Sequence, residues 1–324
     1  RSSPGQFIGE VRAELRKVAW PTRAETMRLS VIVFIAILIL GPRLGVDAGG
    51  PVSILGLPIH TSITDADIRT ERFSEPLDDA RSANVSLELY VGRTTIHALE
   101  DSDQLIDAQL AHIGEIDFRA TGESDKTIHL SQREEISFGP LLGNGMRLNW
   151  DIGLSPEVPL DLAIDVRSGP AEADLRALQL QSLEIDGGSG PLDVTLPEGA
   201  TDYRARIDVG SGPIDISAPE GSVLSDLEIA GGSGPLTIAI EAGARLQASI
   251  DAGSGPVTVD VPEQAGVRVR VVDDGSGPFR VPSNYVRTEG GADDTGTWES
   301  PNYNSAAQRI DLEFALGSGP VAVQ

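Results

Sequence analysis

Carboxylates recur at one fixed place in the second half of the chain, and they are the side chains best suited to chemistry there. The column consists of Asp165, Asp186, Asp208, Asp251 and Asp273. Stacked in register, these residues would present the oxygen ligands that Ca²⁺ prefers. The column is interrupted at Ala230 and Ala315. We therefore favour a solvated acidic face that discourages edge-to-edge aggregation, with a calcium site as the weaker alternative.

One corner of the chain is similar to a calcium-binding sequence. Residues 187–193 read Gly-Gly-Ser-Gly-Pro-Leu-Asp, which is similar to the calcium-binding nonapeptide repeat. In that repeat the aspartate follows the third glycine by two residues, whereas Asp193 follows Gly190 by three. The similarity therefore adds little support to a calcium site.

The histidines give no catalytic or metal-binding pattern. The four are His60, His97, His112 and His129, and no two of them have the i,i+4 spacing of a paired histidine metal site. His97 and His129 fall in strand-like segments, where we expect them to face solvent. The chain has no cysteine, so thiolate chemistry is excluded. With no paired nucleophile and base in view, we expect no enzyme activity and no cofactor.

The net charge of the chain limits the classes of partner that it can bind. The chain of 324 residues has a net charge of −24, which opposes binding to nucleic acid. Residues 1–28 differ from the rest, because they contain six basic and three acidic groups. The acidic excess therefore lies entirely after residue 28.

A repeated Ser-Gly-Pro tripeptide organises the second half. Its prolines are spaced by 21, 22, 22, 21, 22 and finally 42 residues. The predicted structural turns are Gly169, Pro170, Gly190, Pro191, Gly212, Pro213, Gly234, Pro235, Gly255, Pro256, Gly277, Pro278, Gly319 and Pro320. Such a period is typical of a solenoid. We expect glycine here for the positive φ of a tight corner, and a second corner at segments such as Pro197-Glu198-Gly199.

Apolar residues recur at fixed distances from each corner. Those six residues before the proline are Ile164, Ile185, Ile207, Ile229, Ile250, Val272 and Phe314. Those one and three residues after it are also apolar, except for small alanines in the first repeat. Each period thus predicts two short strands with inward-facing ladders on either side of the corner. The fold class predicted is mainly β, a β-solenoid of 21–22-residue coils over residues 151–324.

Two segments depart from this repeat. Residues 47–150 predict an irregular, β-rich N-terminal part, in which Leu105–Leu110 forms at most a turn of helix. The double interval predicts a capping hairpin at about 283–307, because the ends of solenoids need caps. An aromatic binding loop built on Trp298 and Tyr303 is the weaker alternative there.

The first 46 residues predict two helices. Residues 1–21 form an amphipathic helix with a basic-rich polar face, ended by Trp20-Pro21. Residues 22–46 start with a capping box and contain the apolar run Leu29–Leu40, 12 residues or about 18 Å of helix. We predict a short transmembrane helix, with its basic N-terminal flank in the cytoplasm and the C-terminal domain extracytoplasmic. The rival interpretation is a cleaved signal peptide.

The string from Phe7 to Thr26 resembles SecE, the small subunit of the bacterial Sec translocon. The core of this string is Glu14-Leu15-Arg16-Lys17-Val18-Ala19-Trp20-Pro21-Thr22. The resemblance covers about residues 6–40. It implies an amphipathic helix on the cytoplasmic membrane face and a spanning helix that braces SecY. It also implies a partner contact through Glu14, Lys17, Val18, Trp20, Pro21 and Thr22. The sequence departs from the family at Gly41-Pro42-Arg43, where the family continues apolar.

Residues 52–324 resemble a second family, the toast-rack or "putative adhesin" β-solenoids related to LiaF and other cell-wall-active antibiotics response proteins. The matching segments are Ile54–Pro58, Trp150–Leu162, the Gly-Ser-Gly corners and Thr297–Ala307. The resemblance implies an extracytoplasmic domain with walls of β-sheet.

Two functions follow as hypotheses. The first is a SecE-like subunit of the protein translocation channel that carries an extracytoplasmic β-solenoid. The alternative is a membrane-anchored envelope, adhesion or envelope-stress protein in which the SecE-like segment is only a tether. Both predict a single-pass protein of the cell membrane.

Overall fold

The computed structural model describes residues 52–54, 57–59, 68–133, 148–199, 202–290 and 295–324. Both predicted helices, at 1–21 and 22–46, lie outside these ranges. Within them, no helix is long and apolar enough to cross a membrane. The chain divides into two compact units, Arg1–Ile63 and Thr64–Gln324. In the first, β1 (Val52–Ile54) pairs with β2 (Leu57–Ile59) in an antiparallel hairpin.

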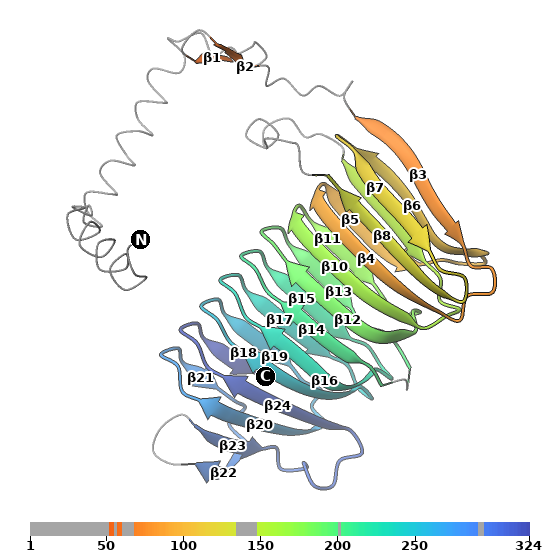
Figure 1. Cartoon of the computed structure of the whole chain (residues 1–324). Coiled ribbons are helices and arrows are strands. Elements are labelled where there is room, and N and C mark those ends of the chain that lie inside the picture. The colour runs from red at the N-terminus through yellow and green to blue at the C-terminus, as the bar shows by residue number, and fades with distance from the viewer. Residues whose placement is uncertain (1–51, 55–56, 60–67, 134–147, 200–201, 291–294) are drawn as a thin grey trace, which may run out of the picture. The chain divides into compact units, whose positions relative to one another are not determined.

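The second unit consists of two long sheets (Figure 1). The 12-stranded sheet runs, in spatial order, β22 (Val286–Gly290), β23 (Gly296–Glu299), β20 (Gly266–Asp273), β24 (Arg309–Ala315), β18 (Arg245–Asp251), β16 (Val223–Ala230), β14 (Arg204–Asp208), β12 (Leu180–Gly187), β10 (Leu160–Ser168), β4 (Ser82–Val91), β8 (Asp125–Gln132), β7 (Ile116–Thr121). The 11-stranded sheet runs β21 (Phe279–Arg280), β25 (Val321–Val323), β19 (Val257–Asp260), β17 (Leu236–Ile240), β15 (Ile214–Ala218), β13 (Leu192–Thr195), β11 (Ala171–Asp174), β5 (Arg93–Ala98), β9 (Asn149–Leu154), β6 (Gln104–His112), β3 (Arg69–Pro76).

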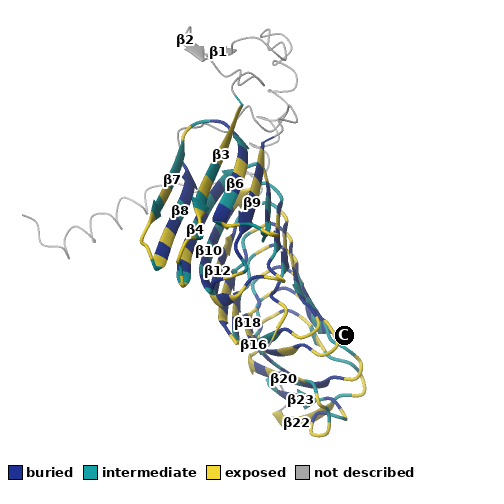
Figure 2. Ribbon diagram, turned by 90° about the vertical axis from the view of Figure 1, so that its right-hand side faces the viewer, coloured by how far each residue is buried: buried dark blue, intermediate teal, exposed yellow. Residues whose placement is uncertain are grey.

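Most neighbouring strands are parallel and in register with the repeat. Ile164 pairs with Ile185, and Ile185 with Ile207. These side chains are at most 2% exposed and join one core cluster that both sheets enclose. Figure 2 shows the resulting alternation of buried and exposed residues along the strands in the middle of the sheets. The predicted mainly-β fold and its stacked coils are therefore confirmed.

The prediction of burial is wrong for one residue of the inward column. Val272 was expected in the inward column but is 44% exposed. The pairing of β20 with β24 is irregular between Val271 and Asp273, so Val271 takes the place opposite Phe314. An irregularity of this kind adds one residue to a strand and turns the next side chain outward.

The corner glycines are required for a different reason from the one expected. Of the seven Ser-Gly-Pro glycines, only Gly169 has a positive φ. At Gly212, an added Cβ would overlap the carbonyl oxygen of Gly190 in the coil beside it, and Gly190 meets Gly169 in the same way. Close stacking of main chains therefore excludes any side chain. Positive φ belongs instead to the second corner, at Gly199, Gly221 and Gly243.

The parallel ladders continue below residue 151. β4 and β5 pair in register with β10 and β11, and Gly92 occupies the corner between them. Leu105–Leu110 lies within strand β6 and is not helical, which corrects the expected helical turn. The rings of Phe73 on β3 and Phe118 on β7 lie 5.5 Å apart at this end of the two sheets.

A buried lysine fastens the outer strand β3 to this end. Lys126 on β8 is 3% exposed and donates to Glu75 at 2.8 Å, the Pro76 carbonyl at 2.7 Å and Asp78 at 3.0 Å. Burial alone would lower the pKa of Lys126, but the hydrogen bonds and charges of the two carboxylates outweigh it and raise that pKa. The ammonium is therefore charged and fully paired.

The coils at the other end do not follow sequence order. β24 lies between β18 and β20, and β25 lies between β19 and β21. β22 and β23 form a hairpin that covers the outer edge of β20. Trp298 of this hairpin packs on Phe279, with ring centroids 5.1 Å apart, and Tyr303 is 5% exposed. Trp298 and Phe279 pack against the core, whereas Tyr303 lies under the guanidinium of Arg268 and donates to Asp311 at 2.7 Å. The aromatic rings are thus covered within the chain, which argues against an aromatic binding loop.

We expect Gly234→Ala to destabilise the solenoid by about 1–3 kcal/mol, because its Cβ would overlap the main chain of Gly212. The neighbouring Ser233→Ala, at the exposed part of the same corner, should change stability by less than about 0.5 kcal/mol. Urea unfolding followed by circular dichroism measures both. Equal midpoints for the two variants would contradict the stacking argument.

Candidate functional site

The acidic column lies on the outer face of the 12-stranded sheet. Its spatial order is Glu88, Asp165, Asp186, Asp208, Ala230, Asp251, Ala315, Asp273. Alanine thus separates the last three aspartates, which lowers the repulsion between like charges at strand spacing. Asp165 pairs with Arg167 at 3.0 Å and Asp208 with Arg206 at 3.3 Å. No set of three or more metal-ligating side chains gathers within the described ranges.

A second acidic row, which the sequence analysis missed, crosses the outer face of the 11-stranded sheet. It places Asp193 between Glu172 and Asp215 on adjacent parallel strands. Partial burial and then the charges of Asp215 and Glu172 raise the pKa of Asp193. The members of this row lie two residues after each corner proline. Threonine also occurs at that position in the repeat, so the acidic residues did not stand out as a continuous column.

A polar depression with a volume of about 380 Å³ lies on the 12-stranded sheet. Its floor is Gln247 and Ser249 on β18. We call it the polar groove. Two carboxylates stand on either side of the floor: Asp226 and Glu228 on β16, and Asp311 and Glu313 on β24.

Each of these carboxylates has an arginine beyond it. Arg204 reaches Asp226 at 2.7 Å and Arg206 reaches Glu228 at 3.2 Å. On the other side Arg268 lies 3.8 Å from Asp311, and Arg270 lies 3.2 Å from Glu313. Exposed pairs of this kind contribute about 0–1 kcal/mol each. Each carboxylate of the polar groove is therefore paired with an arginine, and the groove is rich in hydrogen-bonding groups.

The three described histidines differ in environment. His97 is partly exposed and its Nε2 lies 3.1 Å from Asp151. His129 on β8 is neither fully buried nor fully exposed. His112 is 1% exposed, and neither ring nitrogen has a hydrogen-bond partner. This environment was not predicted, because the strand that ends at His112 was not recognised from the sequence.

The environment of His112 favours the neutral ring. Burial lowers its pKa from the ordinary value, and Arg69 on the paired strand β3 acts in the same direction. Glu71, with its carboxylate 3.8 Å from Nε2, opposes them without reversing the shift. The unfolded chain therefore binds a proton at His112 more readily than the folded chain does.

We expect this histidine to make the solenoid less stable in acid. Stability falls as pH drops below about 6.5, the pKa of an unfolded histidine, by up to about 1.4 kcal/mol per pH unit. His112→Leu cannot titrate and should remove this part of the pH dependence without loss of stability at pH 7.5. Thermal melts from pH 7.5 to 5 measure it. If both proteins lose stability equally, another group carries the effect.

The predicted partner-contact residues Glu14, Lys17, Val18, Trp20, Pro21 and Thr22 lie outside the described residues.

The predicted turn residues lie between the two strands of each coil. The carbonyl of each corner proline accepts a main-chain hydrogen bond from an adjacent coil, as in Ala171 N to Pro191 O at 2.9 Å. The corners thus hold coils together and add no chemistry.

Comparison with known proteins gives two family matches. Residues 63–217 match the model described as the N-terminal domain of toast_rack, DUF2154. Residues 5–45 match the SecE/Sec61-gamma subunits of the protein translocation complex. No curated protein matches the chain.

Solved structures also show similarity. A "putative cell adhesion protein" from Clostridium sporogenes is 16% identical, with 79% of this chain and 98% of that chain covered and a TM-score of 0.40. A "putative adhesin" from Bacteroides fragilis is 13% identical, with 79% and 97% covered and a TM-score of 0.36. A third, from Parabacteroides distasonis, is 12% identical, with 80% and 98% covered and a TM-score of 0.32.

Both family resemblances seen in the sequence are thereby confirmed: the chain contains a SecE-type segment at residues 5–45 and a toast-rack region at residues 63–217.

Proposed function

We propose that this protein is a SecE-like subunit of a protein translocation channel that carries an extracytoplasmic β-solenoid. The observation that carries the proposal is the SecE match at residues 5–45, which contains the Glu14–Thr22 string. By that resemblance Trp20, Pro21 and Thr22 form the hinge before the membrane helix and contact a SecY-type subunit. The basic flank before Leu29 favours a cytoplasmic N-terminus.

The solenoid supports a scaffolding role in this proposal. Its coils are joined by main-chain hydrogen bonds along two sheets, so it is a stiff element. Its outer faces offer paired charges and the polar groove, and no catalytic arrangement is found among its described residues. A translocon subunit of this kind would hold a rigid, acidic surface beside the channel on the far side of the membrane.

A second function is a tethered envelope or adhesion protein. The toast-rack match over residues 63–217 favours it, because that region is larger than the SecE-type segment. The apolar run Leu29–Leu40 favours it too, since 12 residues are fewer than the roughly 20 that span a bilayer. In this alternative the SecE-type segment anchors the solenoid and binds no SecY.

Affinity purification from mild detergent tests the first function. The full chain should recover the SecY-type subunit, and Trp20→Ala with Pro21→Ala should lower recovery by more than about tenfold. A buried tryptophan anchor is commonly worth at least about 2 kcal/mol of binding. Ser233→Ala, far along the solenoid, is the matched control and should leave recovery unchanged. Absence of the SecY-type subunit from intact translocon preparations would contradict the proposal.

Complementation separates the two functions. If the chain is a working translocon subunit, residues 1–63 alone should sustain secretion in cells depleted of their own SecE. If the segment is only a tether, it should fail to do so, while the full chain still reaches the membrane. Cleavage of the solenoid by protease added to spheroplasts would report its extracytoplasmic location independently.

A further inference from the structure

The coil Arg309–Val323, made of β24 and β25, is placed inside the solenoid and not at its end. We call it the inserted coil. On one side it pairs with β18 and β19, and on the other with β20 and β21. The space between these two pairs of strands is the insertion site. Without the inserted coil, the insertion site would be bounded by two open parallel edges, which strongly favour pairing with another strand.

The hairpin explains why the coil cannot add elsewhere. β23 is already hydrogen-bonded to the outer edge of β20, from Arg268 opposite Glu299 to Val271 opposite Gly296. Only the inner edge of β20 is then left for a parallel neighbour. The inserted coil bridges that edge to β18, so it joins the hairpin and its coil to the body of the solenoid.

The apolar contacts of the inserted coil are deep. Ile310 and Phe314 are 0% exposed, and Phe314 lies 6.3 Å from the ring of Phe279. The neighbouring strands present the same repeat, with Ile250 opposite Phe314. Main-chain pairing and this ladder therefore give affinity, but they distinguish weakly between one coil of the repeat and another.

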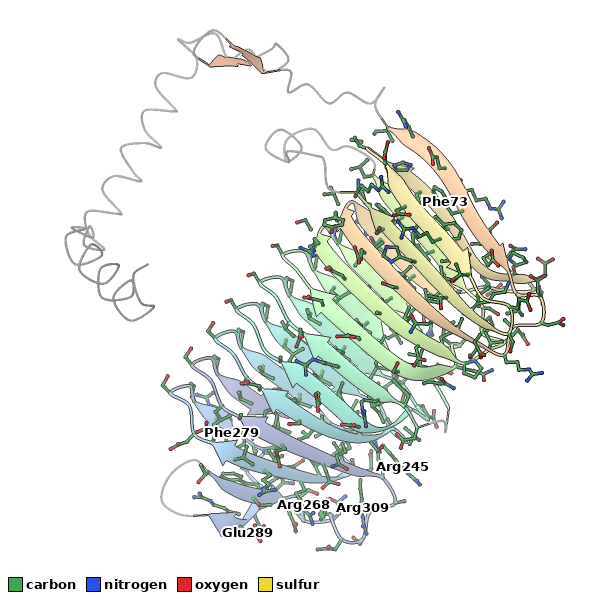
Figure 3. All side chains as sticks on the ribbon, in the orientation of Figure 1. Phe73, Arg245, Arg268, Phe279, Glu289 and Arg309 are labelled. Carbon is green, nitrogen blue, oxygen red and sulfur yellow. The ribbon has the colours of Figure 1, made fainter. Side chains whose placement is uncertain are left out.

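Outward-facing charges distinguish the inserted coil from the other coils of the repeat. Asp311 and Glu313 of the inserted coil face Arg268 and Arg270 on β20. Arg268 also bonds Glu299 of β23 at 3.0 Å, so it stands between two carboxylates. If β24 lay outside β20, the hairpin strand would bring Glu299 beside Asp311. Figure 3 shows Arg268 near the hairpin, at the same end of the solenoid as Phe279.

Every one of these contacts is made to strands outside the inserted coil, and the nine-residue loop 300–308 connects that coil to the hairpin. We propose that the inserted coil exchanges between two copies of this chain, so that the insertion site of one copy receives Arg309–Val323 of the other. The contacts in the exchanged form are the same, which makes such swapping a low-cost route to a dimer. The order of synthesis is compatible with this exchange, because the strands that border the insertion site, β18 to β21, precede residues 309–323 in the chain.

Single-cysteine variants test the exchange, since the chain has no cysteine of its own. Thr258 on β19 and Ala322 on β25 are directly paired, face outward and lie away from the polar groove. Full-length Thr258→Cys and Ala322→Cys are unfolded together in detergent, refolded and oxidised. We expect an intermolecular disulfide between positions 258 and 322 that increases with protein concentration and is mapped by mass spectrometry.

In the control variant the cysteine stands at Thr237, one strand further away, and Thr258 is left unchanged. Thr237 on β17 is separated from Ala322 by β19, about 9.6 Å at strand spacing, which is beyond the reach of a disulfide. The double variant Thr258→Cys, Ala322→Cys shows that the pair oxidises within one chain. If the mixed 258–322 disulfide is no more abundant than in the Thr237→Cys control, the exchange is refuted.

Charge reversal tests whether the ion pair between Arg270 and Glu313 selects which coil enters the insertion site. Arg270→Glu is added to the Thr258→Cys chain and Glu313→Arg to the Ala322→Cys chain. Insertion within one chain then brings like charges together, whereas insertion of the second chain's coil into the first restores an opposite pair. We expect several-fold more 258–322 disulfide than without the reversals. An unchanged yield would overturn the selecting role of this pair.

Discussion

The close approach of one coil's main chain to the next is the constraint on which the rest of the solenoid depends. At Gly190, Gly212 and Gly234 the neighbouring carbonyl oxygen stands where a Cβ would be. This contact fixes the stacking at every corner, and the strands on both sides inherit their register from it. The apolar ladders then bury one face of each strand, and the outer face is left to charged pairs.

The repeat made much of this predictable. Seven Ser-Gly-Pro corners with apolar residues at fixed offsets indicated stacked coils, inward ladders and an acidic outer column. The Gly92 corner and its coil escaped notice because that corner has neither the serine nor the proline. Val272 was misplaced because an added residue in β20 shifts the strand by one, and a column alignment cannot detect such a shift.

The sites were harder to predict than the fold. The polar groove depends on β24 lying beside β18, and the sequence separates those strands by more than 50 residues. The buried position of His112 depends on strand pairing with β3 and β9. Neither leaves a local pattern. The SecE-type string is the opposite case, because its information lies in consecutive residues and it was recognised without any knowledge of the fold.

The order of the coils also limits how such a protein can change in length. The Phe73–Phe118 end is closed by antiparallel strands, and the other end is closed by the hairpin and the coil that joins it to the body. Duplication of a 22-residue unit between β12 and β19 would leave both closures intact. Each duplication would lengthen the solenoid by about 4.8 Å. The distance between its two ends is therefore open to stepwise evolutionary adjustment through the middle of the gene.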